Sequence, residues 1–211
     1  PNFTDGTNQV LNGDFATDLT SWYNKSSTST WVLGSAVTDN TIGNAISGIY
    51  QNIGLVSGKS YKLTATMKLN SGDADGNFKV LTSSASGGSQ STIFTGSSLV
   101  IGGAYVTETF YFTHSGTDVS IQFACDATNA IFELDNVSCE ELGADWTLGT
   151  GINISDGLAN FTGSPNANIN QDAGLITGKS YKIVFTISNY VSGDIDYNVG
   201  GNTRQGNIAA D

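Results

Sequence analysis

The chain has 211 residues, of which only 13% are charged, and it contains 26 glycines and two prolines. Its formal net charge is −11 and its isoelectric point is near 4.2. Phosphate backbones are bound by clustered lysine and arginine, so this composition argues against a nucleic-acid partner. No stretch of the sequence is apolar over the length of a membrane span, so we expect no membrane-spanning segment. A chain rich in Gly, Ser, Thr and Asn favours short strands joined by tight turns over amphipathic helices.

The N-terminal part of the chain is predicted to contain three short strands. Residues 1–8 have the character of a leader or a loose terminus. Residues 9–15, QVLNGDF, are expected to form the first strand, which ends at a polar turn. Trp22 and Trp31 then mark two short strands on either side of a Ser/Thr-rich loop.

A turn followed by a strand occurs twice in the chain. Residues 51–68 read QNIGLVSGKSYKLTATMK, and residues 171–188 read QDAGLITGKSYKIVFTIS. These two stretches, the first copy and the second copy, share nine identical residues in eighteen positions, which indicates duplication. In the first copy an apolar residue alternates with Lys or Thr from residue 61 to residue 68. This period of two is typical of a half-buried strand.

The remaining strands of the first module follow at regular spacing. Residues 76–82 and 91–95 are predicted strands that flank a loop rich in Ser and Gly. Further along, Phe132 and Leu134 alternate, and Val137 then continues the apolar series after a slip of one residue. Such a slip at the Asp-Asn pair predicts a β-bulge.

The chain has two cysteines, Cys125 and Cys139. We expect the strands 117–125 and 130–139 to form a hairpin. In a hairpin of this register Cys139 lies several residues away from Cys125, too far for a disulfide. Both thiols are therefore predicted to be free.

These strands predict an all-β protein made of β-sandwich modules. We assign residues 9–141 to one complete module and residues 142–211 to the N-terminal half of a second module of the same kind. Half a sandwich exposes its core face and leaves open strand edges. The sequence is therefore expected to be a piece of a longer protein, or another chain supplies the missing strands.

Three motifs resemble a known family. They are NGDF at residues 12–15 ahead of a Trp, a central Q-x-x-x-L-x-x-G-K-x-Y, and a closing F-x-L-D-N-V-S. Together they are similar to the carbohydrate-binding jelly rolls of the CenC type, which are galactose-binding-like sandwiches attached to secreted glycoside hydrolases. The opening of the second module, W-T-L-G-T-G-x-x-I-x-D-G, also resembles repeats of phage tail and virion appendage proteins. The resemblance implies tandem jelly-roll modules, the second incomplete.

The resemblance also implies a structural calcium ion. In several relatives such an ion ties the N-terminal strand to the final strand, and by motif position Asp14 and Asp135 correspond to its side-chain ligands. The family often has an acidic residue where this chain has Ala16. The alternative is that Asp14 stabilises a turn and Asp135 a bulge.

Sugar binding needs aromatic faces for stacking and amides for hydrogen bonds to hydroxyls. Four residues are candidates, because strand alternation directs some of these side chains away from the core: Trp31, Tyr50, Gln51 and Tyr111. The alternative for each is a place in the core or on an incidental surface.

No motif predicts catalysis. His114 is the only histidine and lies in an expected turn, so a histidine-dependent triad or metal site would rest on this residue alone. No carboxylate stands out from surface charge, and we predict a protein that is not an enzyme.

We therefore expect a non-catalytic adhesion module, similar to carbohydrate-binding proteins, on a virion fibre or another extracellular assembly. Its expected partners are a glycan or other protein subunits, and we expect a homo-oligomer. Two alternatives remain open. One is a purely structural protein that makes protein–protein contacts, and the other is a carbohydrate-binding module of a secreted glycoside hydrolase.

Overall fold

The computed structural model of the chain describes the following residues: 3, 5–40, 46–71, 78–95, 99–125, 130–164, 166–200 and 204–209. For residues 5, 40 and 204–209 it describes the backbone alone. The described residues form strands, turns and irregular segments, with no helix. Accordingly, this part of the chain contains no helix of the length and apolarity needed to cross a membrane.

The chain divides into two compact units, Asn2–Asn170 and Gln171–Asp211, here called the larger unit and the smaller unit. Residues 142–170 thus belong to the larger unit, although by sequence they open the second module. The predicted boundary between residues 141 and 142 separates two copies of a repeated sequence, whereas the two units are defined by their compactness. The boundary therefore stays a prediction.

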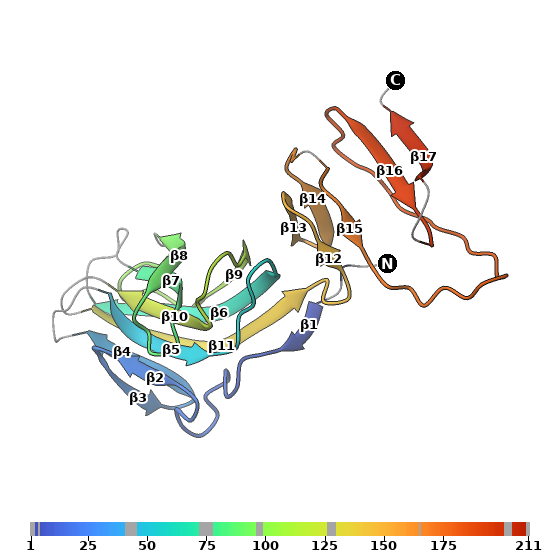
Figure 1. Ribbon diagram of the computed structural model, residues 1–211. Helices are drawn as coiled ribbons and strands as arrows, with labels where there is room; N and C mark the ends of the chain where they lie inside the picture. The colour runs from blue at the N-terminus through green and yellow to red at the C-terminus, as the bar shows by residue number, and fades with distance from the viewer. Residues whose placement is uncertain are drawn as a thin grey trace. The chain divides into compact units, whose positions relative to one another are not determined.

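The larger unit is a sandwich of two antiparallel sheets (Figure 1). Sheet A has the order β3-β4-β11-β6-β9, with β1 also paired to β11. Its strands are β1 (Asp5–Asn8), β3 (Thr28–Val32), β4 (Ser35–Asn40), β6 (Ser60–Ser71), β9 (Val106–Thr113) and β11 (Ala130–Leu142). Sheet B has the order β2-β5-β10-β7-β8. Its strands are β2 (Tyr23–Lys25), β5 (Ser47–Asn52), β7 (Phe78–Ser83), β8 (Gln90–Thr95) and β10 (Ser120–Cys125).

The short strands of the chain pair two by two. In the larger unit β12 (Thr147–Leu148) pairs with β15 (Ile169–Asn170), and β13 (Ile152–Ser155) pairs with β14 (Leu158–Phe161). In the smaller unit β16 (Asp194–Asn198) pairs with β17 (Arg204–Ala209).

The core of the sandwich lies between the two sheets and follows the predicted alternation. Tyr61, Leu63 and Met67 of β6 are at most 1% exposed. The rings of Phe78 in sheet B and Phe132 in sheet A meet edge to face, with their centroids 5.4 Å apart. Directly opposed residues alternate between this core and the outer face of each sheet. The all-β jelly-roll prediction is confirmed.

The predicted β-bulge is present in β11. Asp135 is paired with Thr66 and Ser138 with Thr64, so β11 has one residue more than β6 over this stretch. Asn136 lies in this bulge and has a φ of 48°. Val137, 3% exposed, thereby returns to the core. The irregularity in the apolar pattern was therefore a reliable sign of the bulge.

The expected strand at residues 9–15 is wrong, and the N-terminal strand β1 lies earlier in the chain. Asn12 and Phe15 adopt φ angles of 49° and 43°, which are incompatible with an extended strand. The segment still follows β11 through single hydrogen bonds, such as Val137 N–H to the Gly13 carbonyl at 2.8 Å.

The expected hairpin of residues 117–125 and 130–139 is also wrong. β10 pairs with β5 and β7 in sheet B, whereas β11 pairs with strands of sheet A. The chain crosses between the layers here because both strands find partners from distant parts of the sequence. Cys125 and Cys139 form no disulfide, as predicted, although the hairpin from which this was inferred is absent, and both residues are buried.

The close approach of Gly13 to β11 gives a first testable prediction. A Cβ atom at residue 13 would lie 2.0 Å from the carbonyl oxygen of Val137. We expect Gly13→Ala to lower the free energy of unfolding by about 2–4 kcal/mol in urea titrations, because the backbones must separate. Gly116→Ala is the matched control, since its nearest atom would be 3.9 Å away. Equal stability of the two variants would contradict this account.

The buried thiol of Cys139 gives a second prediction. Burial, aided by the charge of Glu140, raises its pKa from 9.0 to about 12. Between these values the unfolded chain loses a proton that the folded chain keeps, so stability falls as the pH rises. At pH 10 we expect this residue to remove roughly 1 kcal/mol relative to pH 7. Cys139→Ala should lose that part of the pH dependence, and an unchanged profile would contradict it.

Candidate glycan-binding face

The four predicted sugar-binding residues do not come together. Tyr50 lies on the outer face of sheet B, and Tyr111 lies on the outer face of sheet A. Gln51 points into the core side of sheet B and is 2% exposed. Trp31 is opposite Ala36 on the core side of the edge strand β3. The four residues thus lie on three different surfaces of the sandwich.

Gln51 and Trp31 both hold the N-terminal segment. The side-chain amide of Gln51 accepts a hydrogen bond from Leu11 N–H and donates one to the Leu11 carbonyl, each at 2.8 Å. The indole Nε1 of Trp31 donates to the Phe15 carbonyl at 2.5 Å. Because their polar atoms are used within the fold, we leave both residues out of the proposed site.

On the outer face of sheet A, where Tyr111 lies, polar side chains form hydrogen bonds and ion pairs with one another. Threonine hydroxyls pair across β6 and β9, as in Thr66 with Thr107 at 2.8 Å. Lysines of β6 pair with carboxylates of β11, among them Lys62 with Glu140 at 3.7 Å. A face of this kind offers few unused polar groups to a ligand.

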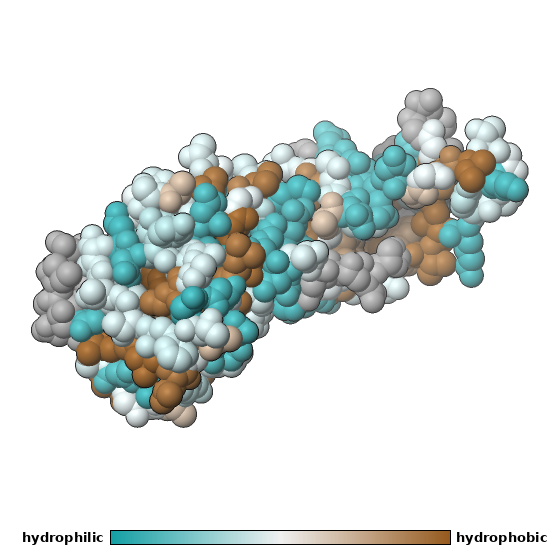
Figure 2. Space-filling view, turned by 90° about the horizontal axis from the view of Figure 1, so that it is seen from below, coloured by the Kyte–Doolittle hydropathy of each residue, from teal (hydrophilic) through white to brown (hydrophobic). Residues whose placement is uncertain are grey.

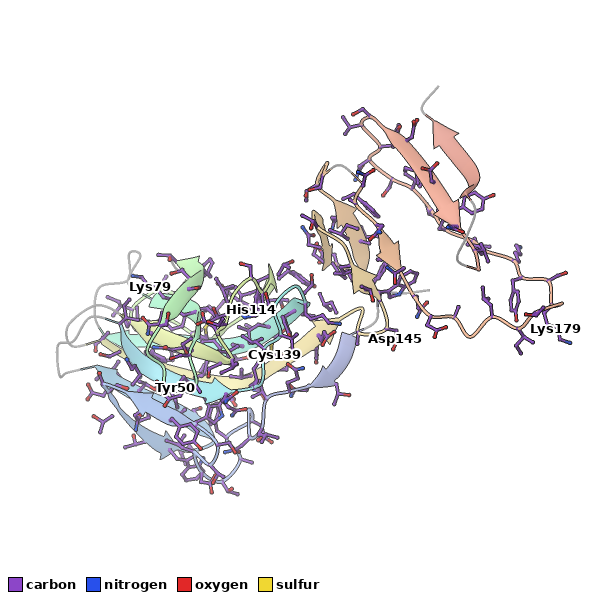
Figure 3. The ribbon with its side chains drawn as sticks, in the orientation of Figure 1. Tyr50, Lys79, His114, Cys139, Asp145 and Lys179 are labelled. Carbon is purple, nitrogen blue, oxygen red and sulfur yellow. The ribbon has the colours of Figure 1, made fainter. Side chains whose placement is uncertain are left out.

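The outer face of sheet B differs in character, and we call it the Tyr50 face. Residues that are directly opposite each other across the strands share this face. Its central row is Tyr23, Tyr50, Gln122, Leu81 and Thr92. One flanking row is Lys25, Gly48, Ala124, Lys79 and Thr95, and the other is Asn52, Ser120, Ser83 and Gln90. Figure 3 labels Tyr50 and Lys79 on this sheet.

Two tyrosines form an aromatic surface at one end of the central row. The ring centroids of Tyr23 and Tyr50 are 5.6 Å apart, with an angle of 30° between the planes. Tyr23 is 57% exposed. The loop 84–89 closes over Tyr50, because a Cβ atom on Gly87 would lie 3.0 Å from its ring. Tyr23 therefore offers the open ring, and the loop borders it.

Polar atoms without partners lie on the same face of the sheet. Gln90 Nε2 donates to Gln122 Oε1 at 2.9 Å, which leaves Gln122 Nε2 with no hydrogen-bond acceptor among the described residues. The hydroxyls of Ser83 and Ser120 are likewise buried without a partner there. Buried polar groups are nearly always hydrogen-bonded, so these atoms invite a water or a ligand.

This arrangement suits the binding of a polyhydroxylated molecule. Aromatic rings stack on apolar faces, and amides and hydroxyls exchange hydrogen bonds with hydroxyl groups. None of the residues in the three rows is Asp or Glu. The face thus presents aromatic rings, amides and hydroxyls, which are groups of the kind that can hold a sugar.

Sequence reasoning missed Tyr23 and Gln122. Trp22 is buried at 7% exposure, so alternation would have directed Tyr23 outward. Its place beside Tyr50 depends on the pairing of β2 with β5, which no local pattern reveals. Gln122 lies between Ile121 and Phe123 in a strand that is buried throughout, and its role depends on the loop above it.

The side chains of the two residues proposed for calcium form hydrogen bonds within their own turn and bulge. Asp14 accepts a hydrogen bond from Ala16 N–H at 3.4 Å, as in a turn. Both carboxylate oxygens of Asp135 bind Asn136 in the bulge, at 2.7 and 2.9 Å. Among the described residues no three His, Cys, Asp or Glu side chains cluster as metal ligands. Calcium prefers six to eight oxygen ligands, so its binding here stays a prediction of the resemblance.

His114 lies where β9 ends. Its backbone N–H donates to the Lys59 carbonyl at 2.9 Å, and its carbonyl accepts from Gly58 N–H at 2.8 Å. The side chain is 4% exposed. Through these backbone hydrogen bonds the residue joins the end of β9 to the turn that precedes β6.

Comparison with known proteins identifies the fold. No protein-family model matches the sequence, and no curated protein matches it. The structure is similar to the CBM22-1 xylan-binding domain of Xyn10C from Paenibacillus barcinonensis, with a TM-score of 0.52 and 14% identity. That match covers 66% of this chain and 97% of the other.

A second similar structure contains the CBM22-1 and GH10 modules of the xylanase Xyn10B from Clostridium thermocellum, complexed with xylohexaose. Its TM-score is 0.50 with 20% identity, and the match covers 68% of this chain and 29% of that longer chain. At these identities the likeness establishes the fold alone. The chain therefore shares the jelly-roll fold of carbohydrate-binding modules.

Proposed function

We propose that the larger unit is a non-catalytic module that binds a glycan chain on the Tyr50 face. The observation that carries this proposal is the tyrosine pair, of which Tyr23 is exposed, together with the buried, unpartnered amide nitrogen of Gln122 opposite Tyr50. The fold shared with carbohydrate-binding modules supports it.

In this proposal a sugar ring stacks on the open face of Tyr23, next to Tyr50. A hydroxyl of the neighbouring sugar accepts a hydrogen bond from Gln122 Nε2. This bond removes the free-energy penalty of burying the amide group without a partner. The loop 84–89 borders the ligand because Gly87 contacts the ring of Tyr50. Access to Gln122 requires this loop to move.

Xylan is the first ligand to test, because the two similar structures contain a xylan-binding domain and bound xylohexaose. A place in a secreted glycoside hydrolase is the setting that these similarities favour. A virion or other extracellular location, an adhesive role and a homo-oligomeric state stay predictions of the sequence resemblance.

The test is calorimetric titration with xylohexaose, preceded by a glycan array to widen the choice of ligand. We expect Tyr23→Ala to weaken binding about tenfold, which corresponds to the loss of one stacking contact. Tyr111→Ala is the matched control, since it removes an exposed tyrosine from the opposite sheet and should bind as the unchanged protein does.

Two results would contradict the proposal. One is that the folded protein binds no glycan on the array. The other is that binding is lost in Tyr111→Ala and kept in Tyr23→Ala, which would place the site on sheet A.

A further inference from the structure

The two sheets of the sandwich differ in charge. The strands of sheet A contain two lysines and seven acidic residues, which are Asp5, Asp39, Glu108, Glu133, Asp135, Glu140 and Glu141. The strands of sheet B contain no acidic residue and two lysines, Lys25 and Lys79. The whole chain has 19 acidic residues against eight lysines and arginines. Sheet B is therefore cationic within an acidic protein.

Both lysines of sheet B belong to the Tyr50 face. Lys25 lies opposite Gly48 and Lys79 lies opposite Ala124, so the two lysines share one flanking row. The other flanking row contains only uncharged residues, which are Asn52, Ser120, Ser83 and Gln90. On the side of the larger unit that Figure 2 shows, hydrophobic patches alternate with hydrophilic ones, so hydropathy singles out no ligand site there. Charge is more specific, because the tyrosines lie between a cationic flank and a neutral one.

Lys25 is held beside the tyrosine pair. It follows Tyr23 by two residues in β2, so both side chains leave the strand on the same face. A Cβ atom on Gly87 would lie 3.4 Å from Lys25 Cδ and 3.0 Å from the ring of Tyr50. The aliphatic stem of Lys25 therefore packs against the loop 84–89 that borders the rings. A lysine packed in this way keeps its ammonium group at the surface.

The ammonium group of Lys25 forms no ion pair among the described residues. The loop 84–89 has the sequence SASGGS and carries no charge. Asp118, which precedes β10, is 6% exposed, and its carboxylate accepts a hydrogen bond from Thr82 Oγ1 on the core side at 2.7 Å. Lys79 takes part in another interaction, which leaves Lys25 as the cation that can meet a ligand.

The amides of the Tyr50 face also favour a ligand that accepts hydrogen bonds. Gln122 Nε2 can only donate, and it has no acceptor among the described residues. Two amide oxygens of the face are already occupied. Gln122 Oε1 accepts from Gln90 Nε2 at 2.9 Å, and Asn52 Oδ1 accepts from Gly54 N–H at 3.1 Å. An ionised carboxylate accepts and never donates, so an open amide donor and a lysine on one face suit it.

We propose that the Tyr50 face selects a glycan whose sugars carry carboxylates, as in a chain with uronic acid side groups. This inference rests on the glycan-binding function proposed above and names the class of ligand for that site. The neutral sugar backbone lies along the central row, and a carboxylate accepts a hydrogen bond from the ammonium group of Lys25. Hydrogen bonds between charged partners are stronger than those between neutral ones, so this contact distinguishes charged from uncharged side groups.

The spacing of the rows indicates where the acidic group leaves the backbone. Neighbouring rows on one face are two residues apart along a strand, or about 6.5–7 Å. A single sugar attached to the unit that stacks on Tyr23 therefore reaches the row of Lys25. The neutral flank offers no cation to the same group, so the side group points to the Lys25 flank. Acidic residues elsewhere on the chain have little effect, because charges beyond the Debye length, about 8 Å at physiological ionic strength, are largely screened.

The test is calorimetric titration of the whole chain with two ligands that differ only at one carboxyl group. One is a xylo-oligosaccharide with a single glucuronic acid side group, and the other is the same compound with that carboxyl group reduced to an alcohol. We expect the acid to bind about fivefold more tightly, which is the upper end of the range for an exposed ion pair. If the glycan array indicates a different backbone, the same pair of ligands is prepared from that glycan.

Variants of Lys25 assign the preference to this residue. Lys25→Met keeps most of the aliphatic stem and removes the charge, so its affinities for the two ligands should be nearly equal. Lys25→Glu should bind the reduced ligand more tightly than the acid, because like charges then meet. Lys62→Met is the matched control, since Lys62 pairs with Glu140 on sheet A and its replacement should keep the fivefold preference.

Two results would overturn this inference and leave the proposed function intact. One is equal binding of the two ligands to the unchanged protein. The other is a preference for the acid that Lys25→Met retains or that Lys62→Met loses. Failure of both ligands and of every glycan on the array to bind would overturn the proposed function as well.

Discussion

The pairing of β6 with β11 is the interaction on which the sandwich depends. β11 is hydrogen-bonded to β6 over most of its thirteen residues, and its other edge holds β4 and then β1. Burial of large apolar side chains along β6 contributes about 1.5–3 kcal/mol for each residue such as Leu63. The bulge at Asn136 directs the side chains of β11 that follow it back into the core. The backbone of Gly13 packs against β11 next to this bulge. The NGDF and DNVS motifs therefore serve the same contact.

The second copy shows how much of a strand its own sequence determines. Its turn forms through the hydroxyl of Tyr181 without help from other elements. The residues that follow have the alternation of a strand, yet they remain unpaired among the described residues because no neighbouring backbone accepts their hydrogen bonds. Whether a segment forms a strand depends on its pairing partners as well as on its side chains, which explains why two stretches that share half of their residues differ in exposure within one molecule.

The sequence predicted features that depend on local pattern. The alternation in β6 and the bulge in β11 follow from residue spacing. The absence of a disulfide was predicted correctly, but from a hairpin that the structure does not contain. Features that depend on which strand neighbours which were not predictable. The supposed hairpin before β11 failed for that reason, since β10 and β11 lie in opposite sheets. The Tyr50 face was only partly foreseen, because Tyr23 and Gln122 reach Tyr50 through pairings between distant strands.

The central claim is that the same motif is a protected strand in one unit and an open one in the other. Hydrogen–deuterium exchange, followed by mass spectrometry on the intact chain, compares the two copies in a single sample. We expect amides of residues 60–68 to exchange slowly, because β6 is bonded on both edges. Amides of residues 180–188 should exchange at rates near those of an unstructured peptide. Equal, strong protection of both copies would contradict the claim, because it would show that the second copy already has its partner strands.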